Sequence, residues 1–336
     1  MATYKGIQGY SVQTLASDPS PAASVEGQLW YNSTSGTYKI AVAGAAAWAS
    51  ATALNVEKWG AMGIGTTTAA LVAGGATPAP SNVVTESETY NGSTWTEGNN
   101  INTARRSGAG TGTTTAGMIV GGDSGDAPID ATEFYDGTSW STQTGTLTRA
   151  GGRQGGGIAG ASQSSALYFG GSPSTGYSYD SETWDGTSWS EGNNLTTLRT
   201  GATGAGIVTA ALCIGGSPIK DQVESYDGTC WTETSTDINT ARAAAMSSGT
   251  STACLLYGGA VYPPGNMAIT ESFNGTTWTE IGDMAQARAN AAEAQSPAGL
   301  NTSALAIGGV THDHLMTNAV EEFDGAPVTA KTVTTS

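Results

Sequence analysis

The two histidines of the chain, His312 and His314, are the side chains best suited to chemistry, because they stand two residues apart in the motif THDHLM. At the spacing of a β-strand both imidazoles would lie on one face with Asp313 on the other, which could begin a metal site. Two imidazoles without a third ligand nearby are an incomplete set for a specific metal. We therefore expect no metal and no cofactor at this motif.

Other reactive groups are also dispersed. The stretch GGRQGGG at 151–157 lacks the lysine and the strand-to-helix context of a phosphate-binding loop, and no Ser, His and Asp order typical of a hydrolase is found. Cys213, Cys230 and Cys254 cannot all pair within one chain, and they lie in strand-like segments, where we expect buried free thiols. This inventory predicts a protein that is not an enzyme.

The composition favours a folded chain of short strands and many turns. The 336 residues include 48 glycines and only 12% charged residues, while nine Trp and twelve Tyr are too many large apolar side chains for a disordered chain. The formal net charge of −16 and the absence of any Lys or Arg cluster argue against a nucleic-acid partner. Neither an 18-residue apolar stretch nor a signal-like N-terminus is visible, so we expect no membrane span and synthesis in a cytoplasm.

A repeat of about 47 residues organises most of the chain. Pairs of glycines close short apolar runs at 74, 121, 170, 215, 258 and 308, with spacings of 47, 49, 45, 43 and 50. Between them, turns such as DGTSW place one tryptophan per repeat, at Trp95, Trp140, Trp189, Trp231 and Trp278. A basic residue follows nine to eleven positions later, at Arg105, Arg149, Arg199, Arg242 and Arg288. Counting back sixteen residues from Gly74, the interval from Gly121 to Arg105, reaches Lys58.

Each repeat can be divided into four antiparallel strands: a small Gly-rich strand, an apolar strand that ends at the glycine pair, an alternating strand, and a strand that begins at the tryptophan. The third strand carries a glutamate two residues before an aromatic residue, at Glu88, Glu133, Glu182, Glu224, Glu271 and Glu321. One acid and one base per repeat predict a recurring Glu–Arg ion pair, packed under the aromatic ring, that holds neighbouring sheets in register.

This order of Arg, apolar strand with Gly-Gly, Glu-x-aromatic and Trp resembles the kelch repeat. The resemblance implies an all-β, six-bladed β-propeller of four-stranded antiparallel blades over residues 44–328, preceded by a short β segment at 1–43 and followed by a tail at 329–336. The sixth repeat has Val328 where a tryptophan is expected. We expect the segment near Trp48 to supply the outermost strand of the last blade, with APVTAKTV completing that blade as the alternative.

Residues 1–43 lie outside the repeat. GQLWYNSTSGTYKI is typical of a hairpin, VEGQLWYNSTSGTYKI is similar to segments of bacteriophage tail-fibre and other virion proteins, and MATYKGIQGYSVQTLASDP resembles the start of structural proteins of marine, cyanophage-type viruses. The resemblance implies a viral structural protein of the phage particle (a tail fibre, knob or surface decoration), made in the host cytoplasm. It further implies attachment to other virion proteins through residues 1–43, in several copies by symmetry.

Host-surface contact is expected on the face formed by the connections from the second strand to the third and from the fourth strand to the next first strand. On this face the second-to-third loops differ in every repeat, while the turns on the other face are uniform. The candidates for contact with a host-surface glycan or protein are Tyr177, Tyr179, Tyr262, Pro263, Pro264, His312 and His314. Drift of loops without a role is an equally simple explanation of their variety. The alternative function is a soluble propeller that binds or acts on glycans.

Overall fold

The computed structural model of the chain describes residues 12–19, 28–43, 46–78, 82–149, 155–173, 176–262, 265–293, 301–325 and 328–333. All regular elements within these ranges are β-strands, so the prediction of an all-β fold is confirmed. The chain divides into two compact units. Unit 1 comprises residues 1–46 and 324–336, and unit 2 comprises residues 47–323.

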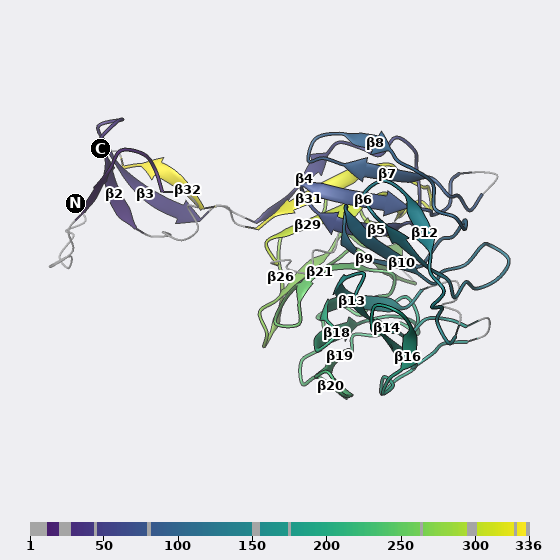
Figure 1. Cartoon of the computed structure of the whole chain (residues 1–336). Helices are drawn as coiled ribbons and strands as arrows, with labels where there is room; N and C mark the ends of the chain where they lie inside the picture. Colours follow the sequence, from purple (N-terminus) through teal and green to yellow (C-terminus); the bar gives the residue numbers. More distant parts are fainter. Residues whose placement is uncertain are drawn as a thin grey trace. The chain divides into compact units, whose positions relative to one another are not determined.

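The described part of unit 2 contains six four-stranded sheets, an arrangement consistent with a β-propeller (Figure 1). The strands of the first five sheets, in order along each sheet, are β5 (Met62–Thr66), β6 (Ala69–Ala73), β7 (Ser87–Tyr90) and β8 (Trp95–Glu97); β9 (Ala109–Thr113), β10 (Ala116–Val120), β11 (Thr132–Tyr135) and β12 (Trp140–Thr142); β13 (Gly157–Ser162), β14 (Ser165–Phe169), β15 (Ser181–Trp184) and β16 (Trp189–Glu191); β17 (Thr203–Ile207), β18 (Ala210–Ile214), β19 (Val223–Tyr226) and β20 (Trp231–Glu233); and β21 (Met246–Thr250), β22 (Ala253–Tyr257), β25 (Thr270–Phe273) and β26 (Trp278–Glu280). Neighbouring strands within these sheets are antiparallel.

The sixth sheet joins strands from opposite ends of unit 2. Its order is β28 (Ala292–Glu293), β29 (Ser303–Ile307), β31 (Val320–Asp324) and β4 (Ala47–Ala51). Trp48 of β4 packs against Phe323 of β31, with ring centroids 5.3 Å apart, and its indole N–H donates to Thr270 Oγ1 of the fifth sheet at 2.9 Å. Trp189 donates to Thr132 of the preceding sheet in the same way, so Trp48 takes the place of a repeat tryptophan.

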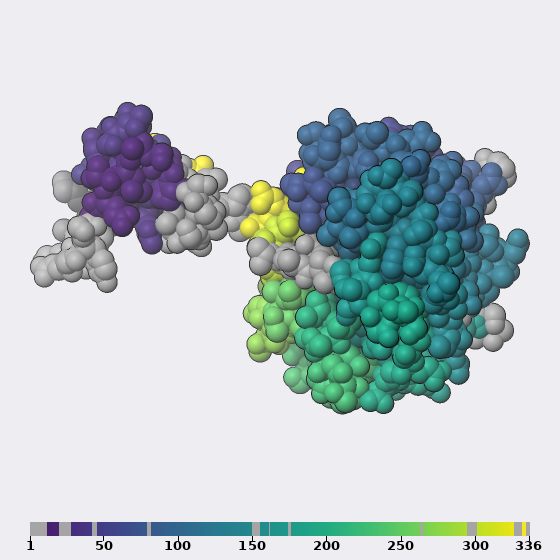
Figure 2. All heavy atoms as spheres, in the orientation of Figure 1, coloured from purple at the N-terminus to yellow at the C-terminus, as the bar shows by residue number. Residues whose placement is uncertain are grey.

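The first strands of the six sheets contact one another in a cycle, and we call the centre of this cycle the axis. Each of the strands β5, β9, β13, β17, β21 and β28 contacts the next, and β28 contacts β5. In the space-filling view the colour of unit 2 accordingly changes gradually with residue number, from blue through teal to green (Figure 2). Backbone hydrogen bonds link one residue per sheet into a ring around the axis, in which each N–H donates to the C=O of the preceding member: Gly60, Ser107, Gly155, Gly201, Ala244 and Asn290.

Five of the six members of this ring, all except Gly155, have a left-handed backbone. Gly60 and Gly201 have φ values of 61° and 60°, and the non-glycine members Ser107, Ala244 and Asn290 have 52°, 53° and 51°. A side chain disfavours this conformation by roughly 1–2 kcal/mol, so the ring is maintained against a local cost. We name these six residues the axial ring.

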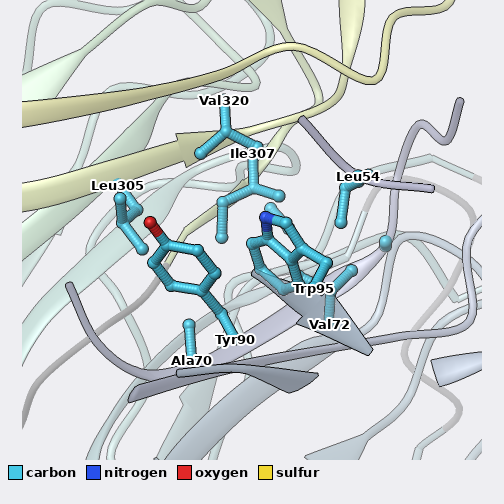
Figure 3. Close-up of a cluster of buried hydrophobic side chains, with 10 residues drawn as sticks. Leu54, Ala70, Val72, Tyr90, Trp95, Leu305, Ile307 and Val320 are labelled. Atoms are coloured by element: carbon cyan, nitrogen blue, oxygen red, sulfur yellow. The ribbon is translucent and has the colours of Figure 1, made fainter. Parts of the chain in front are cut away.

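The hydrophobic core lies between adjacent sheets. Figure 3 shows the cluster in which Tyr90 and Trp95 of the first sheet face Leu305, Ile307 and Val320 of the sixth. The rings of Tyr90 and Trp95 stack with centroids 4.8 Å apart. The other repeat tryptophans also pair with the aromatic residue of the neighbouring strand, in Tyr135–Trp140, Trp184–Trp189, Tyr226–Trp231 and Phe273–Trp278.

The turns between the third and fourth strands are uniform because their first side chain closes them. The Asp136 carboxylate accepts hydrogen bonds from the N–H groups of Thr138 and Ser139, and Gly137 has a φ of 96°. These N–H donors, that of Ser139 first, lower the pKa of Asp136. The Asx turn thus explains the recurring Asp-Gly and Asn-Gly pairs.

Unit 1 is a separate four-stranded sheet. Its order is β1 (Gln13–Leu15), β2 (Leu29–Asn32), β3 (Thr37–Ala43) and β32 (Val328–Thr332). The hairpin expected in residues 27–40 corresponds to β2 and β3, which pair antiparallel. Residues that we assigned to the sixth repeat and to a C-terminal tail instead pair with β3, so β32 does not complete the last sheet of unit 2 as the alternative proposed.

The three cysteines do not share one environment. Cys213 and Cys254 are buried, whereas Cys230 is exposed in the turn between β19 and β20, so the expectation of a buried thiol is wrong at Cys230. In the DGTC turn the backbone N–H of Cys230 donates to the Asp227 carboxylate, and the Cys230 thiol donates to the other oxygen of the same carboxylate.

Thiol labelling should distinguish the three. Burial raises the pKa of Cys213 to about 12 and raises that of Cys254 as well. At pH 8 we expect one thiol per folded chain to react rapidly with Ellman's reagent and three after unfolding in urea. Loss of the fast phase in Cys230→Ser is the control, and a rapid reaction in that variant would contradict the assignment.

Candidate functional site

Most of the buried charged side chains in unit 2 form ion pairs that connect its strands and linkers. The Arg105 guanidinium is fully buried and pairs with Glu133, Nη2 to Oε1 at 2.7 Å. Its Nη1 donates to the carbonyl oxygens of Gly121 and Ala131, at 3.2 and 2.7 Å. Burial lowers the pKa of Arg105, and the Glu133 carboxylate opposes that shift.

The Glu133 carboxylate is satisfied on its other side by the linker that enters the second sheet. Its oxygens accept from the N–H groups of Asn102 and Thr103, at 2.7 and 3.1 Å. The ion pair therefore holds a linker, a glycine-pair strand and a third strand together. The same pairing is formed in three further sheets, by Arg199–Glu224, Arg242–Glu271 and Arg288–Glu321, and Lys58 takes the basic position opposite Glu88 at 3.3 Å.

The third repeat departs from the predicted pairing. Arg149 is 59% exposed and pairs with Asp180 at 3.2 Å, not with Glu182. Among the described residues, no basic side chain forms an ion pair with Glu182. Burial raises the pKa of Glu182, while the N–H of Thr148 opposes the shift.

The register of the backbone explains why Arg149 is misplaced. The N–H groups of Thr148 and Arg149 donate to Glu182 as those of Asn102 and Thr103 donate to Glu133, so Arg149 corresponds to Thr103. The axial ring matches Gly155 with Ser107, which makes this linker two residues longer than that of the second sheet. Counting back two residues from Gly155, the interval from Ser107 to Arg105, reaches Arg153, which lies outside the described residues.

We expect Arg149→Met to change the free energy of unfolding by less than about 1 kcal/mol, because the Arg149 side chain is 59% exposed. Arg105→Met, which removes a fully buried guanidinium from the basic position of the second sheet, should cause the larger loss of the two. Urea denaturation of both variants measures the difference. Equal losses, or the larger loss in Arg149→Met, would contradict this register.

A cavity of about 110 Å³ lies at the axis, at the start of the inner strands. Its lining is dominated by Gly and Ala, and Glu293 is the only charged residue among the described residues that line it. The Ser247 N–H donates to Glu293, and Thr203 Oγ1 lies 3.4 Å from both carboxylate oxygens. Within the described ranges, no group of three or more His, Cys, Asp or Glu could hold a metal ion.

The loops between the second and third strands of the fifth and sixth sheets form one braced cluster. The first contains β23 (Ala260–Val261) and β24 (Gly265–Asn266); the second contains β30 (Val310–Thr311), which pairs with β27 (Arg288–Ala289). Asn266, which is buried, donates through Nδ2 to the carbonyl oxygens of Val310 and Thr311, at 2.7 and 2.9 Å. This side chain therefore fastens the two loops together.

Two predicted residues meet on this brace. The rings of Tyr262 and His314 lie nearly parallel, at 11°, with centroids 6.4 Å apart, and the Tyr262 hydroxyl donates to Asn266 Oδ1 at 3.3 Å. Tyr262 is 62% exposed. Leu315, which follows His314 in the chain, is 65% exposed and was not among the predicted residues. We call Tyr262, His314 and Leu315 the loop platform.

The two histidines are placed by a turn and not by a strand, so the strand expectation for THDHLM is wrong. Residues 312–314 follow β30 in a turn in which the His314 N–H donates to Thr311 O and His314 adopts a φ of 61°. The His312 ring packs against Gly265, where an added Cβ would lie 2.9 Å from Cε1. The two imidazoles thus have separate environments.

Two further predicted loop residues belong to a different sheet from the platform. Tyr177 and Tyr179 are exposed in the loop between β14 and β15 of the third sheet. Pro263 and Pro264 lie outside the described residues. Ile219, in the corresponding loop of the fourth sheet, is a further exposed apolar side chain that was not predicted.

No protein-family model matches the chain. No curated protein matches it significantly. Within the described residues no helix is long and apolar enough to cross a membrane.

Proposed function

We propose that this chain is a non-enzymatic component of a phage particle, built on a six-bladed, kelch-like propeller whose last blade is completed by β4. Its loop face contacts the host surface, and unit 1 attaches it to other virion proteins. The particle assignment rests on the sequence resemblance of residues 1–43.

The loop platform is the observation that carries contact with the host surface. The buried Arg–Glu pairs bind linkers and strands of the same chain, which leaves them no reacting partner. The platform differs from them because Tyr262 and Leu315 are presented to solvent on loops that Asn266 fixes in place. Rigid aromatic side chains that lose little entropy on binding are the usual anchors of recognition surfaces.

Glycan binding by a soluble propeller is the second candidate, and the flat Tyr262–His314 pair favours it. The exposed Tyr262 ring, stacked on His314, offers an apolar face for the C–H face of a sugar, with polar atoms at its edge. The acidic chain, at −16, favours neutral over anionic sugars.

Proteomics of purified particles of the phage that encodes this sequence tests the particle assignment. We expect peptides of this chain at a fixed stoichiometry to the major capsid protein after gradient purification, with an abundant non-virion phage protein as the control. Depletion of the chain together with that control protein would overturn the assignment and leave the soluble glycan-binding propeller.

The platform is tested separately by the binding of the purified chain to host cells and to immobilised neutral glycans. We expect Tyr262→Ala to weaken binding about fivefold to tenfold, because an aromatic contact contributes about 1 kcal/mol or more. Tyr177→Ala, which also removes an exposed tyrosine from a second-to-third-strand loop, is the matched control. Equal losses in the two variants would exclude the platform as the contact.

A further inference from the structure

The four-stranded sheet of unit 1 has one apolar face. Tyr31 of β2 lies opposite Tyr38 of β3 and Thr14 of β1, and Leu29 lies opposite Ile40. Val333 directly follows β32, and its N–H donates to Tyr38 O. Val333 therefore lies opposite Tyr38, on the same face of the sheet. Gln13 of β1 lies opposite Trp30 in a parallel pair, so the preceding residue, Val12, is aligned with Leu29. We call Val12, Leu29, Tyr31, Tyr38, Ile40 and Val333 the apolar face.

The two faces of this sheet differ in exposure. The large apolar side chain of the opposite face is buried, since Trp30 is 2% exposed and its Nε1 donates to Asp18, and Ala41 beside it is 1% exposed. On the apolar face Leu29 is 38% exposed and Tyr38 is 51% exposed. Unit 1 provides 33 of the 291 described residues yet four of the twelve exposed large apolar side chains, and all four lie on this face. Such a concentration marks an interaction surface.

The charge of the chain selects the partner. Residues 1–46 and 324–336 contain three acidic and three basic residues, so unit 1 has a net charge of zero and unit 2 carries the whole −16. Two copies of unit 2 repel each other, whereas two copies of unit 1 do not. The rows of the apolar face carry no acidic residue, and Lys331, opposite Ile40, is their only basic residue. The face is therefore suited to an equally neutral, apolar partner.

We propose that the apolar face of unit 1 binds the same face of a second copy of this chain. Such a contact is self-complementary, as a symmetric oligomer requires, and it buries the exposed side chains that a sheet of this size cannot cover alone. It goes beyond the proposed function, because self-association does not depend on what the loop platform binds or on whether the chain belongs to a particle.

Light scattering coupled to size-exclusion chromatography tests the contact on the full chain. We expect an oligomer whose dissociation constant rises at least tenfold in Leu29→Lys and in Tyr38→Lys. The matched controls in unit 2 are Ile219→Lys, 37% exposed, and Tyr179→Lys, 46% exposed, which should leave the mass unchanged. Raising the salt concentration should strengthen association, because it screens the repulsion between copies of unit 2.

Thermal unfolding of each variant verifies that the exposed substitutions leave the fold intact. A wild-type chain that is monomeric at 100 μM would overturn the proposal. This holds also if the apolar face then binds a different protein, because the proposed partner is a second copy of this chain. An oligomer that persists in both unit 1 variants, or that dissociates equally in the unit 2 controls, would overturn it as well.

Discussion

Replacing Arg105 by methionine is expected to lower the free energy of unfolding by about 3–5 kcal/mol, because the buried Glu133 carboxylate then loses its cation. The carbonyl oxygens of Gly121 and Ala131 also lose a donor. Methionine retains much of the aliphatic volume, so the effect reports the charge and the hydrogen bonds more than a cavity. Urea denaturation followed by tryptophan fluorescence measures the loss.

The double variant Arg105→Met/Glu133→Gln provides the control for this prediction. Glutamine needs no cation and keeps one of the two oxygens that accept from the N–H groups of Asn102 and Thr103, so the double variant should recover part of the loss. Arg149→Met is the exposed comparison. A loss in Arg105→Met no greater than that in Arg149→Met would show that the buried pair does not stabilise the fold.

Replacing Gly63 by alanine is expected to cost about 3 kcal/mol or more, or to prevent folding. An added Cβ would lie 2.1 Å from the carbonyl oxygen of Glu293 and 2.9 Å from its nitrogen. Both atoms belong to the backbone of the sixth sheet, so no side-chain rotation relieves the contact. The two sheets would have to separate at the axis.

Gly176→Ala is the matched control, because it separates crowding from backbone conformation. Gly176 has a φ of 77° but no neighbour within 4 Å of an added Cβ, so this variant should lose only roughly 1–2 kcal/mol. Gly63 is not in the left-handed region, and its loss therefore measures crowding alone. If both variants unfolded at the same urea concentration, the close approach at the axis would be contradicted.

The sequence was most informative where one residue type recurs at one position. Four of the five predicted arginines pair with a predicted glutamate, because a buried guanidinium needs a carboxylate at a fixed place in each sheet. The exception, Arg149, comes from a linker that is two residues longer. Spacing counted from the tryptophan placed Arg149 in the repeat, whereas spacing counted back from the axial ring gives Arg153.

The candidate site was predictable as single residues but not as an arrangement. Tyr262 and His314 were identified because they are ring-bearing residues in loops whose sequence differs from repeat to repeat. Their contact depends on Asn266, whose amide joins two loops that follow different strands, and no local pattern indicates that bond. The pairing of β32 with β3 was missed for the same reason, since nearly 290 residues separate the two strands.

The sixth sheet also determines when the molecule can finish folding. During synthesis β4 emerges near the start of unit 2, but its neighbour β31 is made about 270 residues later. At roughly 5–20 residues per second, the nascent chain carries β4 without its neighbour for on the order of tens of seconds. Loop closure over this distance is slow, and an unpaired strand edge invites association with other chains. A chain truncated before residue 320 keeps that open edge permanently, so its yield depends on translation passing β31 at residues 320–324.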